Sequence, residues 1–192
     1  MSQVRVSGNA SGTGIITVTS PNTNSNYTLT LPAQTGTILT NASTSGFPAG
    51  SVLQVVSVTK TDSFSSSSGS FVDVTGLSVA ITPSSTSSKI LVMATVAVGN
   101  AINNAQINLV RNGTNISQST GGTANDTVAM DFPSSYKLIT YPIMYLDSPA
   151  TTSAVTYKIQ FNPNSATAYI NVRGTDSYFG ATSSITLMEI AA

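Results

Sequence analysis

The chain has 192 residues, about 30% of them Ser or Thr, and it contains no His, Cys or Trp. Seven basic residues balance seven acidic ones, and no cluster of Lys or Arg is present to replace the counterions of a nucleic acid. The missing residue types exclude Ser-His-Asp and Cys-His nucleophiles, thiolate zinc sites and disulfides, while a hydrophobic fraction of 40% predicts a folded chain.

Residues 1–47 are expected to form an N-terminal arm and a β-stem. Short strands are predicted at 15–19, 27–31 and 37–40, between turns rich in Asn, Ser and Pro. A segment of this size carries too few large apolar side chains to offset its own conformational entropy. We therefore expect it to fold by association, with copies of itself or with a larger assembly.

The chain shows neither the apolar core of a signal peptide at its start nor 18 consecutive apolar residues anywhere. We expect a product made in the cytoplasm, with no membrane partner.

The stretch 41–50, rich in Ser, Gly and Pro, marks a boundary, and residues 50–192 are expected to form one all-β domain. Apolar residues alternate with polar ones over 77–82, 155–161 and 168–173, the pattern of half-buried strands. In the last of these, Tyr169, Asn171 and Arg173 fall on the polar face. About nine or ten strands at this spacing indicate an antiparallel sandwich or barrel.

Two stretches, Lys89–Val98 and Leu138–Leu146, are apolar or β-compatible on both faces. Such strands are covered on each side, and in so small a domain the second cover is expected from a neighbouring subunit. Pro142 predicts an edge position or a bulge in the second stretch. Asn112-Gly113 predicts a tight hairpin turn, and a break is predicted over Ser65–Ser70.

Glycoside hydrolysis needs only two carboxylates, so a depolymerase stays open as an alternative. Most of the acidic residues fall in or beside predicted turns, where Asp caps its own backbone, and we expect no catalysis. No Asp-x-Asp-x-Asp pattern occurs for calcium, and we expect no cofactor and no metal ligand within one chain. The acidic residues are Asp62, Asp73, Asp126, Asp131, Asp147, Asp176 and Glu189.

Aromatic rings are the remaining candidates for a binding surface, because a ring face covers a pyranose while a hydroxyl forms hydrogen bonds. Tyr in a strand is more often part of the core or of a subunit interface. The possible glycan contacts are Tyr169, Tyr178 and Phe179, out of a wider set that also holds Tyr136, Tyr141 and Tyr145.

Residues 13 to 40 resemble a stem module of bacteriophage fibres and other virion-surface proteins. The resemblance rests on a Thr-rich strand at 14–21, a Leu-Thr-Leu-Pro step at 29–32 and a Thr-Gly-Thr turn at 35–37. It implies a trimeric stem that grips the virion. The residues expected to trimerise it are Ile16, Val18, Tyr27, Leu29 and Leu31.

From about Gly50 the chain is similar to the heads of tailed-phage fibres, which look like trimeric jelly rolls of the tumour-necrosis-factor type. The hairpin at 107–113 and the Ser177-Tyr178-Phe179-Gly180 step before a last strand at 184–190 carry this resemblance. It implies a homotrimer with a jelly-roll-like head facing outward. An ion on the trimer axis, held by three copies of one residue, stays open.

The resemblance implies a non-enzymatic structural protein on the surface of a bacteriophage virion. Because the module begins near residue 13, a trimeric capsid decoration (cement) protein or head fibre is favoured, bound to the major capsid protein. The alternative is a short tail fibre, attached to a tail component, whose head is a receptor-binding tip for host surface polysaccharide.

Overall fold

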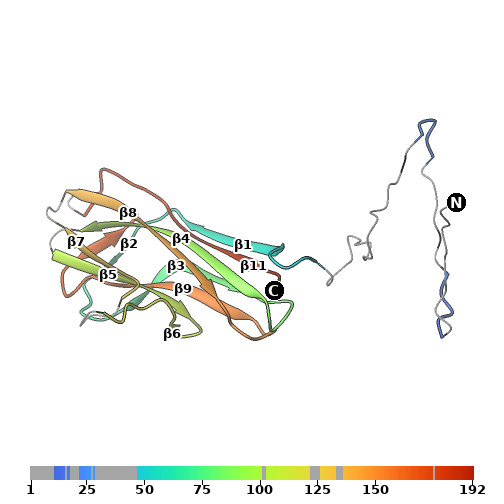
Figure 1. The fold of residues 1–192 in the computed structure, drawn as a ribbon. Coiled ribbons are helices and arrows are strands. Elements are labelled where there is room, and N and C mark those ends of the chain that lie inside the picture. Colours follow the sequence, from blue (N-terminus) through green and yellow to red (C-terminus); the bar gives the residue numbers. More distant parts are fainter. Residues whose placement is uncertain are drawn as a thin grey trace. The chain divides into compact units, whose positions relative to one another are not determined.

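The computed structural model divides the chain into two units, Met1–Ile38 and Leu39–Ala192. It describes residues 11–15, 17, 22–26, 28, 47–100, 103–121, 126–132, 136–174 and 176–192. The five residues expected to trimerise the stem lie outside these ranges. All strands of the described part belong to the second unit (Figure 1). Within the described ranges, no helix has the length and apolar character needed to cross a membrane.

The second unit is a sandwich of two antiparallel sheets, which confirms the expected all-β, jelly-roll-like fold class. Its strands alternate inward apolar and outward polar residues, as the period-two pattern predicts. They are β1 (Val52–Lys60), β2 (Phe64–Ser66), β3 (Val72–Ile81), β4 (Lys89–Asn100), β5 (Asn103–Arg111), β6 (Thr114–Asn115), β7 (Val128–Phe132), β8 (Lys137–Asp147), β9 (Val155–Asn162), β10 (Ala168–Ile170) and β11 (Ser183–Ile190).

One sheet, called sheet A, is built around β4. On one side β4 pairs with β8 along almost its whole length; on the other it pairs first with β11 and then with β10. Strand β1 extends the sheet beyond β11, and β2 extends it beyond β10. The second sheet, sheet B, has the order β3-β9-β5-β6, with β7 also paired to β5.

The core lies between the two sheets and is made of aliphatic and aromatic side chains of both. Burying a large apolar side chain contributes about 1.5–3 kcal/mol, so this layer is the main source of stability. Its largest fully buried apolar members are Leu77, Ile90, Ile107, Leu109, Tyr157, Ile159, Phe161, Ile170, Ile185 and Leu187.

The two stretches that are apolar on both faces form the neighbouring strands β4 and β8. Their inward side chains, such as Val92 and Ile143, lie in the core, whereas outward Met144 and Leu146 are exposed. Pro142 keeps its register opposite Thr95 on an edge strand, because among the described strands β8 pairs only with β4. The edge position is confirmed, and no bulge accompanies it.

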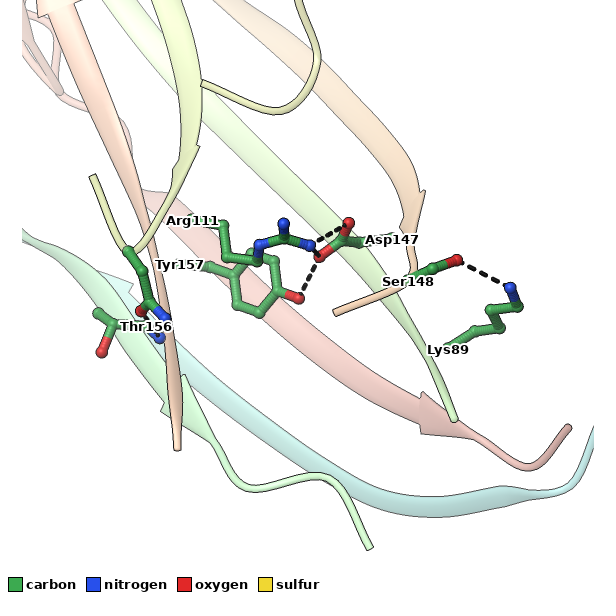
Figure 2. Close-up of polar contacts among 7 residues, drawn as sticks. Lys89, Arg111, Asp147, Ser148, Thr156 and Tyr157 are labelled. Atoms are coloured by element: carbon green, nitrogen blue, oxygen red, sulfur yellow. Dashed lines mark hydrogen bonds and ion pairs between the residues drawn. The ribbon is translucent and has the colours of Figure 1, made fainter. Parts of the chain in front are cut away.

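The two sheets are joined at one end by a polar clamp (Figure 2). Arg111, the last residue of β5, donates to both carboxylate oxygens of Asp147, the last residue of β8, over 2.8 and 2.7 Å. The hydroxyl of Tyr157 on β9 donates to the same carboxylate over 2.6 Å. Burial and this hydrogen bond raise the pKa of Tyr157 far above its ordinary value, so the hydroxyl keeps its proton as a donor.

The predicted turn at Asn112-Gly113 is confirmed. Both residues have positive φ, 47° and 89°, as a type I′ turn requires. The return strand β6 is only two residues long, and the Asn112 side chain accepts a hydrogen bond from the Thr156 amide at 2.9 Å.

Two sequence expectations are wrong. The break predicted over Ser65–Ser70 begins too early, because Ser65 and Ser66 pair with β10 inside β2; long-range pairing outweighs the local preference of Ser for turns. Asn171 does not lie on the polar face of a continuing strand. It follows β10 with φ 68° and is 1% exposed, because its side-chain amide donates hydrogen bonds to the carbonyl oxygens of Lys60 and Asp62.

Candidate functional site

The outer face of sheet A carries a row of apolar side chains that crosses four strands. Val55 of β1 lies opposite Met188 of β11, Met188 opposite Leu91 of β4, and Leu91 opposite Leu146 of β8. Opposite residues of antiparallel strands share a face of the sheet, so the four side chains form one continuous row. Val55 and Leu146, at its two ends, are exposed.

The next row along the same face adds two methionines. Met93 of β4 lies opposite Met144 of β8, and Met144 is 73% exposed. Around them is an open hollow of about 270 Å³, lined also by Thr95, Pro142 and Thr186. We call the apolar side chains of both rows the apolar stripe: Val55, Leu91, Met93, Met144, Leu146 and Met188.

A second surface lies on a small arm that leaves sheet A between β10 and β11, called the 171–181 loop. Its two sides pair with each other: the Arg173 amide donates to the Phe179 carbonyl over 3.0 Å, and the Ala181 amide to the Asn171 carbonyl over 2.8 Å. A bridge joins Val172 to Gly180. Its described residues, 171–174 and 176–181, therefore form a short hairpin whose two sides are joined by backbone hydrogen bonds.

The buried side chain of Asn171 anchors this loop to the sandwich. Its Nδ2 donates to the carbonyl oxygens of Lys60 and Asp62, over 2.9 and 3.0 Å. Its Oδ1 accepts a hydrogen bond from Ser183 at 2.6 Å, and Ser183 accepts one from the Ala97 amide at 2.9 Å. Each polar group of this network has a partner, as burial requires.

Three exposed aromatic rings gather around the guanidinium of Arg173. Its Cζ lies 4.5 Å from the ring centroid of Phe179, 5.7 Å from that of Tyr136 and 6.0 Å from that of Tyr178, within cation–π range. Tyr178 and Phe179 also meet edge to face, with centroids 5.0 Å apart. We call these three rings the aromatic cluster.

Arg173 is held in place by Asp176. Its Nε donates to Asp176 Oδ1 over 2.9 Å and its Nη2 to Oδ2, a two-pronged arrangement that fixes the guanidinium plane. The Tyr178 amide also donates to Oδ1, over 3.0 Å. The hydrogen bonds from Arg173 have the largest effect and that from the Tyr178 amide the next largest. Together they hold the pKa of Asp176 below its ordinary value. The pair is therefore ionised on both sides and carries no net charge.

The apolar stripe and the aromatic cluster lie toward opposite ends of sheet A. Leu91 in the stripe is near the start of β4, and Gly99, which packs beneath the 171–181 loop, is near its end. Eight residues of strand correspond to about 25 Å. The chain enters the sandwich at the stripe end, where Gly50 and Ser51 form backbone hydrogen bonds with Ala191.

No protein-family description and no curated protein sequence matches this chain. Among solved structures it is similar to VP2 of infectious bursal disease virus in a subviral particle, with a TM-score of 0.36 and 10% identity, over 72% of this chain and 37% of that one. It is also similar to a structure of the Gx strain of the same virus, with a TM-score of 0.36 and 15% identity, over 84% of this chain and 43% of that one. The chain thus spans less than half the length of these proteins.

The structure brings two of the three proposed glycan contacts together, Tyr178 and Phe179. Tyr169 lies apart on β10, half-buried and paired with Ser65 and Gly99. Tyr136, from the wider set, joins the cluster instead, while Tyr141 and Tyr145 pack against the core.

Sequence reasoning missed Arg173 and Asp176 as the support of these rings. The signal was present as an Arg and an Asp three residues apart, with two aromatic residues following after Ser177. That spacing is common in turns and does not by itself indicate a platform.

Acidic side chains are largely used for structure. Asp62, Asp73, Asp147 and Asp176 each pair with a Lys or Arg, and fully buried Glu189 accepts three hydrogen bonds from Ser84 and Gln54. Among the described residues, no group of three or more acidic side chains is placed to hold a metal ion.

Proposed function

We propose that this chain is a non-enzymatic structural protein of a bacteriophage virion surface, a homotrimeric capsid decoration protein or head fibre. Residues 1–47 form the arm and stem that attach it, and residues 50–192 form the head. The observation that carries the proposal is the apolar stripe on sheet A. The trimeric state and the phage origin rest on the resemblance of the stem and head sequences.

The stripe is suited to contact with further copies of the same chain. Neither of its two rows contains a charged residue, so identical faces meet without repulsion. Each half-exposed apolar side chain contributes about 1 kcal/mol when it is covered. Methionines adapt their shape to a partner, and three of the six stripe residues are Met. Contact between copies would also supply the second cover that β4 and β8 lack.

The N-terminal segment, residues 1–47, gives independent support, because it has too few large apolar side chains to fold alone. It needs partners in order to fold, and the chain enters the head at the stripe end of sheet A. Copies joined by their stripes would therefore bring their entering chains to one end of the assembly.

Light scattering on the purified full-length chain tests the assembly. We expect three times the 19.7 kDa chain mass for the wild type and a smaller species for the double variant Met144→Lys, Leu146→Lys. The control is Ala80→Lys, an exposed position on sheet B opposite Thr156, which should stay trimeric. A wild-type monomer at micromolar concentration contradicts the proposal.

Location on the particle separates the two structural roles. Gold-labelled antibody against the chain, viewed by electron microscopy on whole particles, should mark the capsid. Label confined to the tail would favour the alternative, a short tail fibre with the head as a receptor-binding tip, which the exposed aromatic cluster supports. A depolymerase would shorten host polysaccharide. We expect incubation of the protein with that polysaccharide to leave its chain length unchanged.

A further inference from the structure

We propose that the aromatic cluster around Arg173 is a binding site for uncharged sugar units of a surface glycan. This binding activity goes beyond the structural role and does not depend on it, because a head on a capsid or on a tail presents the same surface. Tyr136, Tyr178 and Phe179 supply the contact, Asp176 supplies hydrogen-bond acceptors, and Arg173 positions the rings.

The rings are exposed, while the Arg173 side chain that supports them is held by hydrogen bonds to Asp176. Tyr178, Tyr136 and Phe179 are 77%, 62% and 53% exposed, whereas the Arg173 side chain beneath them is mostly covered. Exposed rings held by a guanidinium and by the hairpin lose little freedom when a ligand binds. Prior ordering of this kind lowers the entropic cost of recognition.

The size of the cluster favours a small ligand over a protein partner. An aromatic side chain offers about 150–250 Å², so the exposed fractions of the three rings correspond to roughly 400 Å². A stable protein interface needs about 800 Å² on each side. The available ring surface matches one or two sugar units, whose C–H groups pack on ring faces.

The charges favour an uncharged sugar over an acidic one. Arg173 uses its Nε and Nη2 on Asp176, so this cation is already matched by a carboxylate. The Asp176 side chain is 42% exposed, and its ionised oxygens can accept hydrogen bonds from sugar hydroxyls. The same oxygens repel the carboxylate of a uronic or sialic acid.

The cluster also has a suitable position. It lies at the end of sheet A away from Ser51, where the chain enters the sandwich, so the head presents it far from its own entry point. Assembly through the apolar stripe leaves the cluster uncovered and repeats it once per copy. Several weak sites on one particle bind a repeating glycan more strongly than one site does.

The test uses labelled full-length protein on an array of immobilised neutral oligosaccharides ending in glucose, galactose or N-acetylhexosamine, beside acidic ones ending in uronic or sialic acid. We expect binding to at least one neutral class and weaker binding to the acidic ones. Tyr178→Ala should reduce neutral binding at least tenfold. The matched control is Phe47→Ala, an exposed aromatic three residues before Gly50, whose amide is bonded to Ala191 at the stripe end; it should change binding less than twofold.

Asp176→Asn gives a second readout that loss of fold does not mimic. It removes the negative charge at nearly constant shape, so the ratio of acidic to neutral binding should rise. The unfolding midpoint of each variant checks that the head remains folded. Absence of binding to every neutral sugar, or neutral binding unaffected by Tyr178→Ala, overturns the proposal; the first result is also expected if the cluster serves a protein partner.

This result is separable from the test of assembly. The double variant Met144→Lys, Leu146→Lys should lower the mass of the protein assembly in solution. It should still bind free methyl glycosides, and saturation-transfer NMR measures that binding. Failure of trimerisation with retained sugar binding rejects only the structural proposal, and the converse rejects only the sugar site.

Discussion

Gly99 lies so close to Val172 that a Cβ atom on Gly99 would come within 2.0 Å of the Val172 carbonyl oxygen. No side chain fits in that distance, and backbone atoms cannot yield as the end of a flexible side chain does. Gly99 therefore allows the 171–181 loop to lie against β4. The placement of the aromatic cluster therefore depends on the absence of a side chain at Gly99.

Gly99→Ala should destabilise the head and displace the loop. We expect a loss of about 1–3 kcal/mol, the usual cost of an added methyl in a filled space, together with weaker sugar binding. Gly121→Ala is the matched control, because among the described residues no atom beyond its two chain neighbours lies within 4 Å of its Cβ position. Urea unfolding of both variants measures the difference, and equal midpoints would show that the loop moves without cost.

Asp147→Ala should cost far more than the loss of a surface ion pair. It leaves Arg111 and the Tyr157 hydroxyl without their shared acceptor (Figure 2). Removing one partner of a buried pair costs about 3–5 kcal/mol, and the partial exposure of Arg111 favours the lower end. Lys158→Met breaks the more exposed pair with Asp73 and should cost at most about 1 kcal/mol. Similar losses in the two variants, measured by denaturant unfolding, would contradict a clamp between the sheets.

Asn171→Asp tests whether the amide, and not only the shape, of Asn171 is required. The carboxylate cannot donate to the Lys60 and Asp62 carbonyl oxygens, and it places charge beside them. We expect a loss of roughly 2–4 kcal/mol. Asn164→Asp makes the same change at another residue with positive φ but at an exposed site, and should cost less than about 1 kcal/mol. Thermal and urea unfolding compare them; equal effects would mean that the network contributes little.

Glu189 should make the head sensitive to acid. Burial opposes ionisation of this carboxyl, but hydrogen bonds from Ser84 and Gln54 together outweigh it, and its pKa lies below the ordinary value. The unfolded chain therefore takes up this proton first as pH falls. The resulting stability is present above the ordinary Glu pKa of about 4.3 and is lost as pH falls through the lower pKa of the folded state.

Glu189→Gln removes this titration. We expect the variant to be less stable than the wild type at pH 7 and to lose less stability between pH 5 and pH 3. Urea midpoints across that range measure the difference. Asp62, Asp73 and Asp176 also have lowered pKa values, but their contribution to acid sensitivity is the same in both proteins. Parallel curves for the two proteins would show that Glu189 binds its proton alike in the folded and unfolded states.

Much of the head could be predicted from the sequence because its signals are local. Period-two alternation marked the core residues of β3 and β9, the positive φ demanded at Asn112 and Gly113 marked the hairpin, and Pro142 marked an edge strand. Two strands apolar on both faces predicted a second cover from a neighbouring subunit, and in the single chain the outward side chains Met144 and Leu146 are exposed. The alternation of faces along a strand, the turn at Asn112-Gly113 and the edge position of Pro142 are each set by residues close together in the sequence.

The binding surfaces depended on contacts between distant segments. Val55, Met188, Leu91 and Leu146 become one row only when four strands align, and Tyr136 reaches Arg173 across 37 positions of sequence. Asn171 looked like an outward polar residue, yet its amide is drawn inside by the carbonyl oxygens of Lys60 and Asp62. The sequence by itself determined strands, turns and excluded chemistry, because these follow from backbone preferences and residue types. Only the tertiary structure decided which side chains meet, because register and loop placement are set by the packing of the whole sandwich.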